Sequence, residues 1–161
     1  MPAPAFTIQP VRTRDDLMVA ATLFRLYAEA LEIDLAYQGF EDELAGLPGK
    51  YAPPAGEILL ARASSGQPLG CAAVRPLTEQ VCEMKRLYVA PQARGMGLGK
   101  ALVEAILGVA RNAGYSEMRL DTLDTMDAAI GLYRSFGFVF TSAYYDTPVA
   151  NTVFMALQLG R

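Results

Sequence analysis

A glycine-rich turn that runs into an apolar helix is the stretch of this sequence best suited to bind a ligand. Residues 93–103 read ARGMGLGKALV, with three alternating glycines between Arg94 and Lys100. Glycine is a poor helix residue, and cations are disfavoured at a helix N-terminus. The unpaired N–H groups at such a position attract anions. The turn therefore predicts a phosphate site, and the alternative is a plain connection whose cations face solvent.

Residue spacing excludes two common kinds of phosphate-binding turn. A nucleotide P-loop needs a hydroxyl after its Gly-Lys pair, but Ala101 follows Lys100. The dinucleotide fingerprint G-x-G-x-x-G would begin at Gly95 and then place Lys100 where a small residue packs. Neither pattern fits this chain.

The residue types of the whole chain restrict the chemistry further. The sequence has no histidine, which removes the commonest general base and the commonest zinc ligand. We expect no metal site, so acid–base chemistry must come from carboxylates, tyrosine, lysine or cysteine. Cys71 and Cys82 are too few for a disulfide framework and are expected to be small buried side chains.

Composition predicts one soluble domain over residues 1–161. Hydrophobic residues make up 52% of the chain and charged residues 19%, which fits a globular protein with a sizeable core. The net charge of −3 argues against nucleic acid or an anionic membrane as a partner. No apolar run approaches the roughly 18 residues that span a bilayer, and the N-terminus has no signal-peptide pattern. The cytoplasm is the expected location.

Hydrophobic periodicity predicts the elements that must position the turn. Strands are expected at 6–11, 57–63, 68–77, 80–90, 117–123, 137–145 and 151–159, and helices at about 15–31, 40–47, 97–113 and 125–136. Short turns make the strands before residue 90 antiparallel, and the helical crossover makes the strands on either side of it parallel. The expected fold class is α/β of the α+β type. It has a single mixed, mostly antiparallel sheet of about seven strands flanked by helices.

One further spacing pattern fits the glycine turn at every position. The motif R-x-x-G-x-G/A matches RGMGLG at 94–99, after the strand RLYVAP, and resembles the acetyl-CoA-binding motif of the GNAT superfamily of N-acetyltransferases. A second block, AAIGLYRSFGF at 128–138, resembles the A-x-x-L-Y-x-x-x-G-F segment of that family. The two blocks come in the family's order, and the predicted elements follow the family fold from end to end.

The resemblance implies acetyl-CoA as the cofactor. Backbone N–H groups of the turn would hold the pyrophosphate, and the preceding strand would pair with the pantetheine arm as with an added strand. The thioester would lie in a gap between the parallel strands 80–90 and 117–123. The residues assigned to the cofactor in this way are Leu87, Tyr88, Val89, Arg94, Gly95, Met96, Gly97, Leu98, Gly99 and Lys100.

Two residues are predicted to be catalytic. Tyr133 matches the family tyrosine that protonates the departing thiolate, which suits a phenol with a pKa of about 10. Glu83 is the candidate base for the acceptor ammonium, directly or through ordered water, and the alternative is a salt bridge to Lys85 or to a neighbouring strand. Strand alternation is expected to place Glu83, Lys85, Leu87 and Val89 on one face.

One position departs from the family pattern. Met126 stands seven residues before Tyr133, where the family often has an asparagine that contacts CoA and helps to cap the helix. Asp124 or Thr125 is the expected N-cap instead.

The acceptor pocket is expected between the first two helices and the last hairpin. Aromatic side chains there, with an arginine able to bind a carboxylate, suit a small amine such as an amino acid. The residues concerned are Tyr37, Phe40, Tyr51, Arg75, Tyr144 and Tyr145. A protein N-terminal or lysine acetyltransferase and a non-enzymatic acyl-CoA-binding module remain alternatives, and a homodimer is left open.

Overall fold

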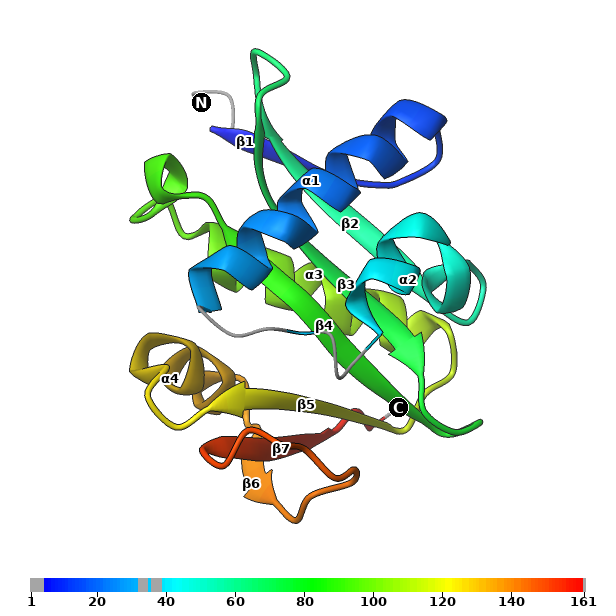
Figure 1. The fold of residues 1–161 in the computed structure, drawn as a ribbon, viewed down its shortest axis with the longest axis vertical. Coiled ribbons are helices and arrows are strands. Elements are labelled where there is room, and N and C mark those ends of the chain that lie inside the picture. Colours follow the sequence, from blue (N-terminus) through cyan, green and yellow to red (C-terminus); the bar gives the residue numbers. More distant parts are fainter. Residues whose placement is uncertain (1–4, 32–34, 36–38, 161) are drawn as a thin grey trace.

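Seven strands form one mixed sheet in the computed structural model, which describes residues 5–31, 35 and 39–160 (Figure 1). The strands are β1 (Phe6–Pro10), β2 (Glu57–Ala63), β3 (Pro68–Pro76), β4 (Val81–Val89), β5 (Glu117–Leu123), β6 (Val139–Thr141) and β7 (Thr152–Gln158). Their order across the sheet is β1-β2-β3-β4-β5-β7-β6. Only β4 and β5 run parallel among these neighbours. The predicted fold class is confirmed.

Helices cover both faces of this sheet. Helices α1 (Arg14–Leu31) and α2 (Phe40–Ala45) lie on one face, and α3 (Leu98–Asn112) and α4 (Asp127–Ser135) lie on the other (Figure 1). The interior of β2 is buried on both sides: Ile58 packs in the core beneath α1, and Leu59 packs in the core beneath α3. A strand buried on both faces reads as the continuous apolar run that EILLARA shows.

A β-bulge at Arg86 interrupts the alternation of β4. Ala73 faces Lys85 across the β3–β4 ladder, whereas Cys71 faces Tyr88, so β4 carries one extra residue. Arg86 accommodates it with a φ of 61°, a left-handed conformation that is uncommon outside glycine.

The bulge overturns the expectation that four alternate residues of β4 share a face. Met84 belongs to the core beneath α3, so its neighbours Glu83 and Lys85 point to the α1 side. Beyond the bulge, Leu87 and Val89 pack against the α3 side instead. The strand therefore turns its charged residues toward α1 and its later apolar residues toward α3.

Strands β4 and β5 part after a short shared ladder. Their paired residues are Val81 with Glu117, Cys82 with Met118, and Glu83 with Arg119. Each strand continues beyond that point on its outer partner: β4 with β3, and β5 with β7. The gap between them widens along the strands (Figure 1), as expected for the thioester site.

Two local expectations are wrong. The strand predicted over 137–145 is confined to β6, and Tyr144 and Tyr145 lie beyond it because their hydroxyls bond to acids of β4 and β5. Met126 occupies the N-cap of α4, and no side chain caps that helix. Asp124 instead accepts a hydrogen bond from Asn151.

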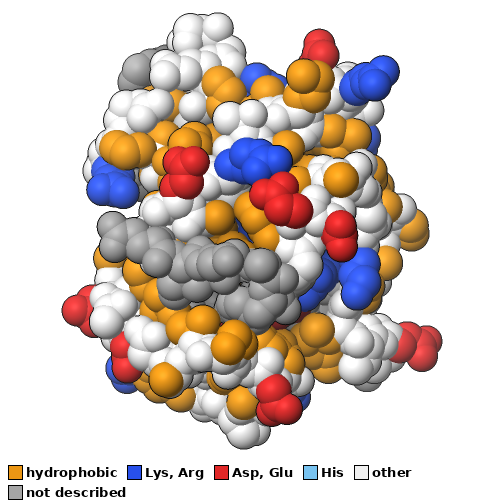
Figure 2. Space-filling model, in the orientation of Figure 1, with side chains coloured by type: hydrophobic (Ala, Val, Ile, Leu, Met, Phe, Trp, Pro, Cys, Tyr) orange, Lys and Arg blue, Asp and Glu red, His pale blue; other side chains and the backbone are white. Residues whose placement is uncertain are grey.

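The face that carries α1 and α2 shows no concentration of one charge sign (Figure 2). Acidic and basic side chains are interspersed with apolar ones on the face that carries α1 and α2 (Figure 2). Within residues 5–31 and 39–160, none of the helices has the length and apolar character needed to cross a membrane.

Candidate active site

A cavity that is partly open to solvent lies where β4 and β5 part. Its walls come from α1, β4, β5 and α4, which are distant in sequence. The polar and apolar groups that matter for chemistry are Tyr27, Lys85, Arg86, Leu87, Asp121 and Tyr133. The gap between the strands is therefore lined by charged groups and opens to solvent.

Tyr133 reaches this cavity from α4. Its ring is buried and packs edge-on against Phe138, with 5.8 Å between the ring centroids. Burial raises the pKa of the Tyr133 phenol above its ordinary value, and the nearby Tyr27 and Asp121 add to the effect. The hydroxyl therefore keeps its proton at neutral pH, as a proton donor must.

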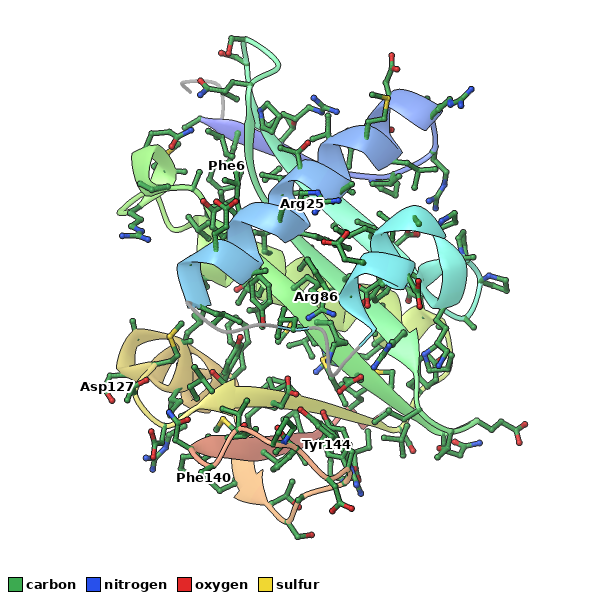
Figure 3. All side chains as sticks on the ribbon, viewed as in Figure 1. Phe6, Arg25, Arg86, Asp127, Phe140 and Tyr144 are labelled. Carbon is green, nitrogen blue, oxygen red and sulfur yellow. The ribbon has the colours of Figure 1, made fainter. Side chains whose placement is uncertain are left out.

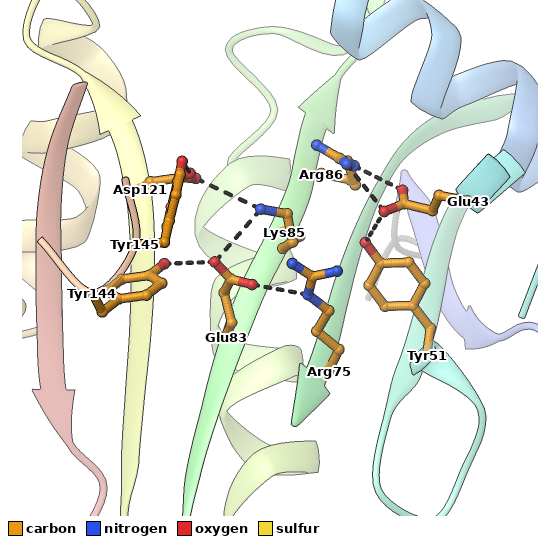
Figure 4. Close-up of polar contacts among 9 residues, drawn as sticks. All are labelled: Glu43, Tyr51, Arg75, Glu83, Lys85, Arg86, Asp121, Tyr144 and Tyr145. Atoms are coloured by element: carbon orange, nitrogen blue, oxygen red, sulfur yellow. Dashed lines mark hydrogen bonds and ion pairs between the residues drawn. The ribbon is translucent and has the colours of Figure 1, made fainter. Parts of the chain in front are cut away.

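Glu83 is buried and fully engaged (Figure 4). Arg75 Nε donates to its Oε1 at 2.9 Å, and Tyr144 donates its hydroxyl to Oε2 at 2.6 Å. Lys85 Nζ lies 3.5 Å from the same Oε2. The salt bridge to Lys85 is therefore present, and so is one to the neighbouring strand β3 through Arg75, whereas the sequence did not indicate Tyr144 as a partner.

Lys85 links the two parted strands. Its ammonium lies 3.9 Å from Asp121 Oδ1 on β5, and Tyr145 donates a hydrogen bond to Asp121 Oδ2. Burial lowers the pKa of Lys85, and the charges of Asp121 and Glu83 oppose that shift. Sequence reasoning missed Asp121 as a site residue. Only the register of the two parallel strands could have indicated Asp121: where residue 83 pairs with residue 119, Lys85 lies next to Asp121.

The glycine turn has the backbone geometry of an anion cradle. Gly95 and Gly97 have φ values of 82° and 77°, and a Cβ placed at either position would meet no atom within 4 Å. Gly97 is the N-cap of α3, no side chain caps that helix, and the bond from Ala101 N to Gly97 O (3.1 Å) closes its start. The first N–H groups of α3 are thus open to a ligand.

The turn adjoins the cavity. A Cβ at Gly99 would lie 3.4 Å from a methyl of Leu132 on α4 and 3.8 Å from one of Val89 on β4. Leu132 adjoins the cavity-lining Tyr133 on α4, and Val89 lies two residues beyond the cavity-lining Leu87 on β4. Leu98 is buried in the core and anchors the start of α3, whereas Arg94 and Lys100 are exposed.

Comparison with known proteins identifies the family. The model of the acetyltransferase (GNAT) family matches residues 21–138, which is most of the chain. The chain belongs to this acetyltransferase family. An uncharacterized N-acetyltransferase of Schizosaccharomyces pombe is 44% identical over 156 residues, covering 96% of each protein.

Solved structures of GNAT acetyltransferases share this fold. A Klebsiella pneumoniae protein assigned as an acyl-CoA N-acyltransferase is 30% identical and has a TM-score of 0.73, covering 98% of this chain and 99% of its own. A Salmonella typhimurium acetyltransferase solved with its cofactor acetyl-CoA is 22% identical, with a TM-score of 0.71 over 96% of this chain and 94% of its own. The predicted GNAT membership and acetyltransferase class are confirmed, and acetyl-CoA is the cofactor of the family.

The residues present suit that cofactor. Beyond the last β4–β5 pair, Tyr88 and Val89 pair with β3 on one edge, and the β5 ladder leaves their other edge open. An extended arm can add to such an edge, and the open glycine cradle of the same enzyme lies beyond it.

Of the predicted acceptor residues, Phe40 and Tyr51 support Arg86 rather than line the cavity. Arg86 lies on β4 between α1 and α2, with its guanidinium 5.1 Å from the Phe40 ring (Figure 3). Glu43 binds Arg86 through two hydrogen bonds, of 3.0 and 3.1 Å, and also accepts one from the Tyr51 hydroxyl at 3.0 Å. Tyr37 lies outside the described residues.

Tyr144 and Tyr145 form a second layer behind the two acids. The two rings meet edge-on at 5.5 Å, and each hydroxyl bonds one carboxylate, Glu83 or Asp121. Arg75 lies behind Glu83 in the same way. None of the described acceptor candidates is in the cavity wall itself. Phe40 and Tyr145 contact the wall residues Arg86 and Asp121, whereas Arg75 and Tyr144 bond Glu83, which lies behind the wall.

The cysteines take no part in this site. Cys71 and Cys82 are free and buried, and burial raises their pKa, that of Cys82 to about 12. Thiols held protonated are poor nucleophiles. Over the part of the chain that the structure describes, no group of three acidic or cysteine side chains is arranged to bind a metal.

Proposed function

We propose that this GNAT enzyme transfers the acetyl group of acetyl-CoA to the primary amine of a small molecule, an amino acid or a related amine. One observation carries the proposal: a single cavity at the β4–β5 gap brings a protonated tyrosine together with buried charged groups. A proton donor and a proton acceptor are the two groups that amine acetylation requires of the protein.

Acetyl-CoA supplies an acetyl group activated as a thioester. The backbone of 94–100 is proposed to hold its pyrophosphate, with the exposed cations Arg94 and Lys100 favouring the negative charge. The open edge of Leu87, Tyr88 and Val89 is proposed to pair with the pantetheine arm. Met96 and Leu98 anchor the turn through the core and contribute main-chain groups.

Tyr133 and Glu83 are proposed to move the protons. An alkyl ammonium is nearly all protonated at neutral pH and must lose a proton before its nitrogen can attack. Glu83 stands at the base of the gap for this task, directly or through other groups. Tyr133 Oη is the donor for the leaving sulfur.

Arg75, which lies behind Glu83 and outside the cavity wall, is the proposed group for an acceptor that carries a carboxylate. Its Nε is bound to Glu83, and the structure gives its two terminal nitrogens no hydrogen bond within the described residues. The side chain is 23% exposed. A guanidinium fixed at one end with an open fork suits a carboxylate, which favours an amino acid over a simple amine.

The test is release of free thiol from acetyl-CoA, measured across amino acids, polyamines and short peptides. We expect amine-dependent release with small acceptors, with amino acids the best of them. Release with peptides alone would assign the chain to the protein acetyltransferases instead. The cytoplasmic location and a homodimer stay predictions.

A further inference from the structure

Two carboxylates flank one buried ammonium at the point where β4 and β5 part. Glu83 and Arg119 are the last paired residues of the β4–β5 ladder, and the next residues on the same faces are Lys85 and Asp121. Lys85 Nζ lies 3.5 Å from Glu83 Oε2 and 3.9 Å from Asp121 Oδ1. The Lys85 ammonium thus bridges the two carboxylates at the point where the strands part.

The two carboxylates have matching phenol partners. Tyr144 donates to Glu83, and its neighbour Tyr145 donates to Asp121 (Figure 4). Hydrogen bonds of this kind favour the ionised form of each acid. The tyrosine partners therefore do not distinguish the two acids, and any difference must come from their other contacts and their exposure.

Access to the cavity separates the two acids. Glu83 has a side chain only 2% exposed, is bound on both oxygens and is absent from the cavity wall. Asp121 has a side chain 14% exposed and lines the cavity together with Tyr133. A proton acceptor must come within hydrogen-bond reach of the proton it removes. Asp121 meets that requirement more closely than Glu83 does.

We infer that Asp121 is the carboxylate that takes the proton from the acceptor ammonium, while Glu83 is a positioning residue that acts on it through Lys85. This inference rests on the proposed function. It deepens the sequence-based assignment, because Glu83 keeps a part in the chemistry but acts indirectly.

The proton balance is complete with these groups. The acceptor ammonium gives one proton to Asp121 and becomes a neutral amine. As the C–N bond forms and the C–S bond breaks, Tyr133 Oη delivers its proton to sulfur, and the second proton that leaves the nitrogen returns the Tyr133 phenolate to the phenol. Asp121 then releases its proton to solvent through the open cavity. No oxidant, metal or further reactant is needed.

Charged or titratable groups surround Asp121 from three elements and from the segment after β6, while its partner on β7 is the apolar Phe154. From β4 come Glu83, Lys85 and Arg86; from α1, Tyr27; from α4, Tyr133; and from the segment after β6, Tyr144 and Tyr145. Changes at Lys85 or Arg86 would alter several of these contacts at once. The clearest test therefore changes one oxygen at a time.

The test compares Asp121→Asn with Glu83→Gln by pH profiles of kcat for the best small amine. For Asp121→Asn we expect kcat to fall about 10²- to 10³-fold, with an unchanged KM for acetyl-CoA. The acidic limb of the kcat profile should move to higher pH, because the acceptor ammonium must then lose its proton without a protein base. Glu83→Gln should show a smaller loss and keep the limb in place. Asp15→Asn, at an exposed position on α1, is the control.

A matched pair of tyrosine variants keeps the inference falsifiable if an acid variant fails to fold. Tyr145→Phe removes the donor to Asp121, and Tyr144→Phe removes the donor to Glu83. The acidic limb should move to higher pH only in Tyr145→Phe. A shift confined to Glu83→Gln and Tyr144→Phe, or no shift in any variant, would overturn the inference while leaving acetyl transfer intact. If the wild type showed no turnover with any small amine, that result would instead contradict the proposed function.

Discussion

The charged side chains of this site are held in place by contacts with other side chains. Arg86 is buried at the bulge of β4, where it donates two hydrogen bonds to Glu43 and lies near the rings of Tyr27 and Phe40. A buried charge is tolerated only when it is paired in this way. The charged wall of the cavity is therefore held rigid before any ligand arrives.

Arg75 gives the residue-scale prediction for acceptor choice. Arg75→Gln should raise the KM for an amino acid about 10-fold relative to the same amine without its carboxylate, because a charge-assisted hydrogen bond is lost. The ratio of kcat/KM for the two acceptors is the measurement, since any effect through Glu83 acts on both alike. Arg62→Gln, on the far strand β2 and paired with Asp16, is the control. An unchanged ratio would remove Arg75 from acceptor recognition.

At the scale of elements, sequence patterns predicted the regular parts and missed the irregular ones. The α3 helix and its glycine turn follow from periodicity and spacing. The bulge does not, because Arg86 adopts a positive φ that no residue type at that position signals. The segment with Tyr144 and Tyr145 reads as strand by propensity, but bonds to two distant acids decide its course.

The glycine turn gives the prediction at this scale. Gly97→Ala forces a φ of 77° on a residue with a Cβ, which should cost about 1–2 kcal/mol of stability and weaken CoA binding by distorting the cradle. Gly108→Ala, inside α3 with open space around it and an ordinary φ, is the matched control. That change should stabilise the protein by up to about 1 kcal/mol and leave CoA binding intact. Calorimetric titration with CoA and urea unfolding measure both effects, and equal losses of CoA affinity would contradict the account.

At the scale of the whole molecule, the site depends on a sheet whose two parts share only three residue pairs. Strands β1–β4 form one part and β5–β7 the other, and the cavity lies where their ladder ends. The sequence predicted the parallel pair but left the order β5-β7-β6 open, because strand pairing across a sheet depends on packing distant in sequence. Asp121 was missed because the sequence predicted the parallel pair but not its register, which places Asp121 beside Lys85.

The buried phenol of Tyr51 predicts how the stability of the folded protein changes at alkaline pH. Burial raises the pKa of Tyr51, and the Glu43 charge adds to it. The folded state thus keeps a proton that the unfolded state loses near pH 10. Stability conferred by this group is complete below about pH 10 and is lost as pH rises further.

Tyr51→Phe tests this linkage. The variant should be about 1 kcal/mol less stable at pH 7, because it lacks the hydrogen bond to Glu43. Its stability should then fall less steeply between pH 9 and 11, as urea unfolding at each pH would measure. The lowered pKa of Lys85 makes stability rise with pH instead, but this contribution is the same in the wild type and in Tyr51→Phe. An identical alkaline slope would show that Tyr51 does not carry the linkage.

The measurement that tests acetyl transfer in the β4–β5 cavity most directly is thiol release by the wild type and by Tyr133→Phe, with acetylated amine identified by mass spectrometry. The account predicts stoichiometric thiol and acetylated small amine from the wild type. It predicts a kcat about 10²-fold lower or more in Tyr133→Phe, with acetyl-CoA affinity unchanged. Equal turnover by the two proteins, or no acetylation of any small amine by the wild type, would contradict it.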